Sequence, residues 1–188
     1  WHRQGGWHYG VIQDNLVGLK QDGSLLEVRS SPLPPEQIET SLREYLRLDD
    51  DLEAIYARID TDSRIHEAIA EYHGLRLLRQ EPWECLVSFI CSANSNIPRI
   101  SASMESLALN YGRQLGLGDY VGYSFPSPEK LAAAGEAALR GLKLGFRAKY
   151  VAQAAERVAQ GEVKLEHLRH LPYQEAKEVL TSLPGVGD

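Results

Sequence analysis

The stretch that decides the fold of this 188-residue chain is LLRQEPWECLVSFICSANSNIPRI, residues 77–100. Residues 82–93 are apolar almost all round, which predicts a buried central helix. Pro98 then opens a second helix, which Gly112 ends. The inner stripe of that helix comprises Ile100, Met104, Leu107 and Tyr111. The stretch therefore predicts two helices joined by the short polar turn SANSN.

The chain beyond about Gln80 is expected to consist of helices and loops. A helix starts at Ser127-Pro128, where Ser127 is an N-cap and Pro128 occupies the first helical position. The periodicity of residues 150–158 predicts another helix, ended by Gly161, and residues 172–183 form the last one. Residues 116–125 are predicted to be a loop.

The chain before Gln80 begins differently. Its first 30 residues indicate strands and turns, with Asp22-Gly23 as a strong hairpin signal. Helical periodicity follows over 38–46 and 65–72, and Gly74 closes the second segment. One face of that segment is predicted to comprise Ile65, Ala68, Ile69 and Tyr72. The fold class is therefore α+β: a small antiparallel β-rich domain over residues 1–79, then an all-helical domain over 80–188.

Composition and charge limit the possible functions. Hydrophobic content of 43% with 24% charged residues is ordinary for a globular protein, and no run of about 18 apolar residues predicts a membrane span. The net charge of −6 argues against a simple basic nucleic-acid binder. Residues 1–88 hold 9 Lys and Arg against 16 Asp and Glu, whereas residues 89–188 hold 11 against 10. Four basic residues and no acid lie between Arg140 and Lys149. Any contact with phosphate is therefore expected in the second half.

The cysteines and tryptophans favour a structural over a functional interpretation. Cys85 and Cys91 lie six residues apart in an apolar run, which is not a metal-binding spacing, and both are predicted to be buried. The tryptophans could stack on bases, but Trp7 in a strand and Trp83 on a buried helix favour core packing.

The final residues LPGVGD, 183–188, form a tight turn after the last helix. One interpretation is the first half of a helix-hairpin-helix, whose glycines leave backbone N–H groups uncovered for a DNA phosphate. The other is a helix stop followed by a Pro-Gly turn. These few residues alone do not separate the two.

Three stretches in this order carry a family resemblance: residues 77–100, LKLGFRAKYV at 142–151, and LPGVG. Together they resemble the 8-oxoguanine DNA glycosylase family of helix-hairpin-helix base-excision enzymes. The resemblance implies an N-terminal domain like half of a TATA-binding-protein fold, followed by the helical glycosylase domain. It also implies an enzyme that extrudes 8-oxoguanine paired with cytosine from duplex DNA and removes it by Schiff-base chemistry, with strand cleavage.

The resemblance also implies roles for individual residues. Asn94 would enter the space that the extruded base leaves, Arg99 and Arg147 would contact the unpaired cytosine, and Phe146 would wedge into the base stack in place of the tyrosine common in relatives. The hairpin that holds a phosphate would comprise Gly185, Val186 and Gly187. A cation there would use the backbone carbonyls of Thr181, Leu183 and Val186.

Each of these residues has a structural alternative. Asn94 or Asn96 could cap the helix at Pro98, Arg147 and Lys149 could form a solvated helix start, and Phe146 could belong to the core. We favour the functional interpretation because the residues occur as a set in family order.

The resemblance places the catalytic lysine immediately after Asp188, and an aspartate about twenty residues further on. We therefore expect a fragment that is inactive and poorly stable by itself, in which Lys164 and Lys177 are solvated helix residues. No cofactor or iron–sulfur cluster is expected. The partner would be double-stranded DNA with 8-oxoguanine opposite cytosine, bound by a monomer inside the cell, in the nucleoid or nucleus. The alternatives are a non-catalytic DNA-binding module and a glycosylase for alkylated purines.

Overall fold

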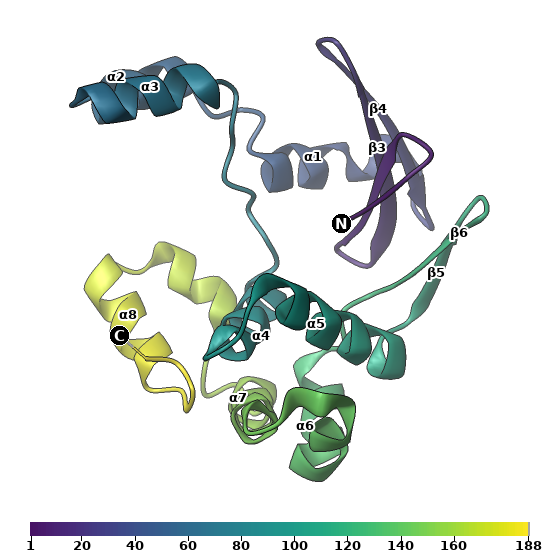
Figure 1. The fold of residues 1–188 in the computed structure, drawn as a ribbon. Coiled ribbons are helices and arrows are strands. Elements are labelled where there is room, and N and C mark those ends of the chain that lie inside the picture. Colours follow the sequence, from purple (N-terminus) through teal and green to yellow (C-terminus); the bar gives the residue numbers. More distant parts are fainter. Residues whose placement is uncertain (188) are drawn as a thin grey trace.

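The N-terminal part is a four-stranded antiparallel sheet in the order β1-β2-β3-β4, as Figure 1 shows in purple and dark blue. The computed structural model describes residues 1–187. The strands are β1 (His2–Gln4), β2 (Trp7–Ile12), β3 (Asn15–Asp22) and β4 (Leu25–Ser31). Asp22 pairs with Leu25 across the turn, and Gly23 has φ +57°, which confirms the predicted hairpin.

Helix α1 (Pro35–Leu46) packs on this sheet and closes a small core. The core joins apolar side chains of β2 and β3 to one face of the helix. Its buried members are Ile12, Val17, Leu19, Ile38, Leu42 and Tyr45. The predicted periodicity of residues 38–46 is therefore confirmed.

Helices α2 (Leu52–Ile59) and α3 (Ser63–Glu71) stand apart from the rest of the fold in Figure 1. Asp51 and Asp62 cap them by accepting backbone N–H groups. Neither helix has a buried residue, and Ile65 and Tyr72 are 36% and 62% exposed. The predicted helical periodicity of residues 65–72 is therefore confirmed by α3, but its face is not buried. Periodicity fixes which side chains share a face, but not whether another element covers that face.

The second half is mostly helical, and one face of α4 (Pro82–Ser92) contributes to its core. The other helical elements are α5 (Ile97–Tyr111), α6 (Pro128–Leu139), the π-helical turn η1 (Arg140–Leu144), α7 (Arg147–Ala159), the 3₁₀ helix η2 (Leu165–His170) and α8 (Tyr173–Thr181). Ser127 caps α6 as predicted, because its hydroxyl accepts the Lys130 N–H. A continuous core of buried side chains from α4, α5, α6 and α7 holds these helices together.

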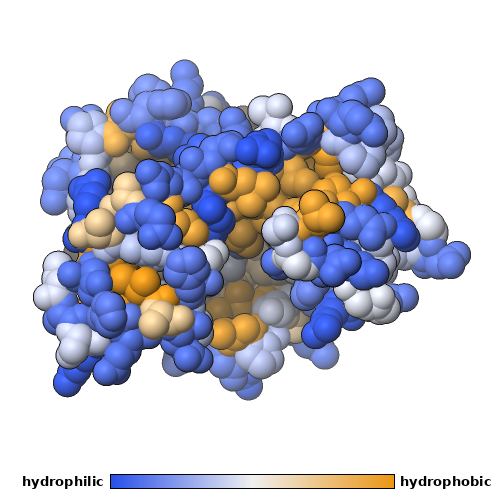
Figure 2. All heavy atoms as spheres, turned by 90° about the horizontal axis from the view of Figure 1, so that it is seen from above, coloured by the Kyte–Doolittle hydropathy of each residue, from blue (hydrophilic) through white to orange (hydrophobic). Residues whose placement is uncertain are grey.

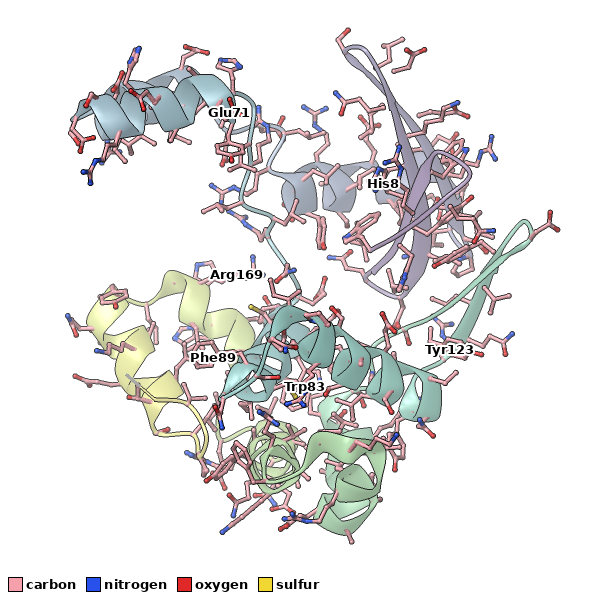
Figure 3. The ribbon with its side chains drawn as sticks, in the orientation of Figure 1. His8, Glu71, Trp83, Phe89, Tyr123 and Arg169 are labelled. Atoms are coloured by element: carbon pink, nitrogen blue, oxygen red, sulfur yellow. The ribbon has the colours of Figure 1, made fainter. Side chains whose placement is uncertain are left out.

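Helix α4 buries only one of its faces, although its sequence is apolar almost all round. Leu86, Val87, Ile90 and Cys91 are buried, whereas Phe89 is 52% exposed and Cys85 is exposed. The predicted burial is therefore confirmed for Cys91 and wrong for Cys85. The exposed face lines an apolar groove of about 770 Å³ between α4, α8 and the linker 77–80. Figure 3 shows Phe89 on the side of α4 that faces α8, and Figure 2 shows apolar side chains gathered in the hollowed middle of one face of the molecule.

Residues 114–123 form a hairpin, so the predicted loop over 116–125 was wrong. Strands β5 (Gln114–Leu117) and β6 (Tyr120–Tyr123) pair antiparallel around Gly118-Asp119. The rings of Tyr9 and Tyr120 stack with their centroids 4.0 Å apart, and Arg113 donates to the Asp14 carbonyl at 3.1 Å. This hairpin from the helical half therefore packs on the N-terminal sheet and joins the two halves. The domain boundary between residues 79 and 80 stays a prediction.

Across residues 1–187, no helix combines the length and the apolar character needed to cross a membrane.

Candidate nucleic-acid interface

The polar turn between α4 and α5 holds its backbone in a defined shape. Ala93 has φ −54° and ψ 117°, Asn94 has φ +50°, and the Ser95 N–H donates to the Ser92 carbonyl at 3.1 Å. These values describe a type II β-turn with Asn94 at its third position, where Gly and Asn are favoured. Asn96, not Asn94, caps α5, because its Oδ1 accepts the Arg99 N–H at 3.1 Å. The exposed Asn94 side chain is therefore not used as the helix cap.

Arg147, at the start of α7, binds this turn directly. Its Nε donates to the Ala93 carbonyl at 2.9 Å, and its Nη2 donates to the carbonyls of Asn94, at 2.8 Å, and of Ala93. Ala93 follows the last residue of α4, so the guanidinium satisfies a carbonyl that a helix end leaves without an intrahelical partner. The two stretches that the sequence singled out, 77–100 and 142–151, thus meet at one point.

Phe146 lies at the surface immediately before α7. Its side chain is 47% exposed, so the core alternative was wrong. The left-handed residues Lys143 and Gly145, with φ +65° and +63°, turn the chain just before it. The Arg147 guanidinium carbon lies 4.6 Å from the centroid of the Phe146 ring, a cation–π distance. The ring is therefore held beside the Asn94 turn with one part open to solvent.

The turn of residues 183–187 that follows α8, called the hairpin turn below, packs against α7. Gly185 has φ +87°, and a Cβ built on it would lie 2.7 Å from Cβ and Cγ of Tyr150. Tyr150 also meets Phe146 edge-on, with ring centroids 6.3 Å apart and an interplanar angle of 79°. Tyr150 thus lies between the hairpin turn and Phe146. The sequence reasoning missed it, although its i, i+4 spacing from Phe146 on a predicted helix was a usable signal.

A hydrogen bond lies within the described part of the hairpin turn. The Val186 N–H donates to the Leu183 carbonyl at 3.1 Å, so one of the three carbonyls considered for a cation already accepts a hydrogen bond within the turn. Asp188, and the position expected to follow it, lie outside the described residues. Among residues 1–187, no cluster of three or more His, Cys, Asp or Glu side chains could hold a metal ion.

The N-terminal turns of α5 and α7 carry basic side chains and no acidic ones. The first turns of α5 and α7 contain no acidic residue. Arg99 lies exposed in the first turn of α5, and Arg147 and Lys149 lie in that of α7. Cations at the positive end of the helix dipole are unfavourable unless an anion is bound there. These two helix starts therefore favour a negatively charged ligand.

Other residues considered from the sequence lie elsewhere. Trp7 is buried, and the half-buried Trp83 donates its indole N–H to the Pro126 carbonyl at 2.9 Å, so neither forms a stacking platform. Lys164 is exposed and precedes η2, but Lys177 is half-buried and lines the apolar groove, which corrects its description as solvated. Burial raises the pKa of the Cys91 thiol to about 11.

Comparison with protein families finds two matches that together cover nearly the whole chain. Residues 1–86 match the 8-oxoguanine DNA glycosylase N-terminal domain. Residues 87–183 match the HhH-GPD superfamily of base excision DNA repair proteins.

Individual relatives agree with this. The N-glycosylase/DNA lyase of Saccharomyces cerevisiae is 37% identical over 81% of the chain and 44% of its own length. The N-glycosylase/DNA lyase OGG1 of Arabidopsis thaliana is 32% identical over the whole chain and 54% of its own length. A crystal structure of Clostridium acetobutylicum 8-oxoguanine glycosylase/lyase, in complex with double-stranded DNA containing cytosine opposite 8-oxoguanine, superposes on the whole chain with a TM-score of 0.90 and 31% identity. The chain spans about half the length of these curated relatives and 64% of that solved structure.

Proposed function

The chain belongs to the 8-oxoguanine DNA glycosylase family within the HhH-GPD superfamily, and from this premise we propose that it supplies the DNA-reading part of a glycosylase and abasic-site lyase for 8-oxoguanine opposite cytosine. The observation that carries the proposal is the meeting of the Asn94 turn, Phe146 and the hairpin turn around the start of α7. Three hydrogen bonds from Arg147 and the packing of Gly185 on Tyr150 hold these parts together.

The roles follow from the chemistry of the side chains. The Asn94 amide both donates and accepts, so it can occupy the position of an extruded base and pair with an orphaned base edge. Arg99 and Arg147 present planar forks of N–H donors, which suit the O2 and N3 acceptors of the unpaired cytosine. Phe146 supplies an apolar ring that can hold the DNA stack open, a role for which the hydroxyl of a tyrosine is not needed.

The hairpin holds the DNA backbone. The N–H groups of Gly185 and Gly187 would bind a phosphate, while that of Val186 donates to the Leu183 carbonyl and holds the turn. A cation on the carbonyls of Thr181, Leu183 and Val186 would add positive charge there. The reaction needs no redox or metal chemistry, because the bond from the amine to the sugar C1′ forms as the bond to the base breaks, the amine proton goes to the departing base with help from the expected aspartate, and no oxidation state changes. That amine would be the lysine expected directly after Asp188, so the 188-residue chain is expected to bind DNA without cutting it.

Binding by the 188-residue chain tests the DNA-reading role. Fluorescence anisotropy would compare duplexes that carry one tetrahydrofuran abasic analogue, opposite cytosine or opposite adenine, with an undamaged duplex. We expect the cytosine duplex to bind about tenfold or more tightly than the other two, because a correct base contact contributes about 1–3 kcal/mol. The affinity should fall steeply as salt rises. Equal affinity for all three duplexes would refute the proposal.

Two variants distinguish recognition of cytosine by Arg99 from a general effect of positive charge. Arg99→Ala should reduce the preference for cytosine, whereas Lys164→Ala removes an exposed cation outside the interface and should leave the preference unchanged. Equal effects of the two variants would show that only net charge matters.

The chemistry is tested on a longer protein that contains this chain. We expect a borohydride-trapped adduct with 8-oxoguanine-containing duplex. DNA binding without an adduct would favour the non-catalytic DNA-binding module. Excision of an alkylated purine instead of 8-oxoguanine would favour the glycosylase for alkylated purines. The protein would act as a monomer wherever the cell keeps its DNA, the nucleoid or the nucleus.

A further inference from the structure

The hydrogen bonds of Arg147 make it part of the DNA-free architecture. Its guanidinium reaches across 53 and 54 residues of sequence to two consecutive carbonyls, those of Ala93 and Asn94. These carbonyls belong to the two peptide bonds on either side of the Cα of Asn94, the residue with the left-handed conformation. Asn adopts a positive φ more readily than most residues with a Cβ, and contacts that satisfy the neighbouring carbonyls favour this conformation further. The contact therefore bears on the one residue of the turn that is expected to enter the DNA.

We propose that Arg147 is a positioning residue for Asn94: it holds the turn of residues 92–95 in its DNA-binding shape before DNA arrives. The proposal rests on the proposed function, because it assigns Asn94 to the DNA. Arg147 would then have two roles: the expected contact with cytosine, and a positioning role that does not depend on which base lies opposite the lesion.

One guanidinium can serve both roles. Its five N–H donors lie in a fixed plane, and the turn uses those of Nε and Nη2. Within residues 1–187, Nη1 carries no hydrogen bond to the protein, so its two N–H groups can still reach a base. An ammonium group has no comparable fork. Arg147→Lys therefore keeps the charge and should lose the hold on both carbonyls.

The first test needs no DNA. Amide hydrogen exchange of Ser95, whose N–H bonds to the Ser92 carbonyl, reports on the turn. We expect this exchange to become about tenfold or more faster in both Arg147→Lys and Arg147→Ala, because charge-assisted hydrogen bonds to the turn are lost. Arg113→Ala is the matched control, since Arg113 also donates to a backbone carbonyl, that of Asp14, but far from the turn. Unchanged exchange of Ser95 in both Arg147 variants would overturn the proposal.

The second test separates positioning from reading of the cytosine. A residue that only reads cytosine loses affinity when cytosine lies opposite the abasic analogue, and little when adenine does. We expect Arg147→Ala to lose about fivefold or more with adenine as well. Loss confined to the cytosine duplex would overturn the proposal.

A third comparison asks whether Arg147 acts through Asn94. Asn94→Gly keeps a residue that suits the third position of a type II turn and removes the side chain that carries the amide. On the adenine duplex, the double variant Asn94→Gly/Arg147→Ala should bind no more weakly than Asn94→Gly alone. Additive losses would show that Arg147 acts separately. If the unaltered chain binds no abasic duplex, the proposed function fails, and the exchange measurement still decides whether Arg147 holds the turn.

Discussion

Replacing Gly185 with alanine should lower the free energy of unfolding by two separable amounts. Its φ of +87° disfavours any residue with a Cβ, which costs about 1–2 kcal/mol. The new Cβ would also lie 2.7 Å from Cβ and Cγ of Tyr150, atoms close to the backbone of α7 that cannot swing away. Overpacking of this kind costs about 1–3 kcal/mol. The expected total for Gly185→Ala is therefore about 2–5 kcal/mol.

Two other glycines provide matched controls. Gly161 has φ +76° and nothing within 4 Å of a built Cβ, so Gly161→Ala measures the backbone strain alone. Gly187 has open space and no positive φ, so Gly187→Ala should change the free energy of unfolding by less than about 0.5 kcal/mol. Urea unfolding of a longer protein that contains this chain, followed by tryptophan fluorescence and circular dichroism, gives all three values. If Gly185→Ala costs no more than Gly161→Ala, the close packing of the hairpin turn on Tyr150 is refuted.

Three further predictions concern exposed or reactive side chains. Phe146→Ala should weaken binding to an abasic duplex about tenfold, and an equal loss of affinity for undamaged duplex would contradict a wedge. The urea midpoint should stay unchanged, because the ring is 47% exposed. Burial raises the pKa of the Cys91 thiol to about 11, so this thiol should stay protonated below that pH. A thiol reagent at pH 8 should therefore modify the exposed Cys85 quickly and Cys91 only after denaturation. Phe89→Ser should reduce binding of the dye 8-anilinonaphthalene-1-sulfonate to the apolar groove, and Leu109→Ser, at an exposed position outside the groove lining, should not.

The main elements could be predicted from local sequence. Pro and Gly set the limits of α5, Ser127-Pro128 set the start of α6, Asp22-Gly23 set the first hairpin, and the apolar run of 82–93 set α4. These signals act within a few residues of the chain, so they do not depend on the rest of the fold. The Gly118-Asp119 turn was an equally local signal that could have identified β5 and β6. Its strands have only four residues each, which is too short for a clear alternating pattern.

Burial was less predictable than secondary structure. The faces of α3 and α4 are both apolar, yet α3 has no buried residue and α4 buries one side only. An amphipathic pattern names the side chains on a face, whereas burial depends on an element brought there from elsewhere in the chain. The exposed Cys85 and the half-buried Lys177 were misjudged for the same reason.

The sequence by itself determined the family, the order of the helices and the residue types that suit an extruded base, an orphaned cytosine and a phosphate. Only the tertiary structure decided that Asn96 rather than Asn94 caps α5, that Arg147 binds the Asn94 turn, and that Tyr150 lies between the hairpin turn and Phe146. The physical reason is distance along the chain. Arg147 and Asn94 are 53 residues apart, and their contact exists only because a shared core packs α4 against α7.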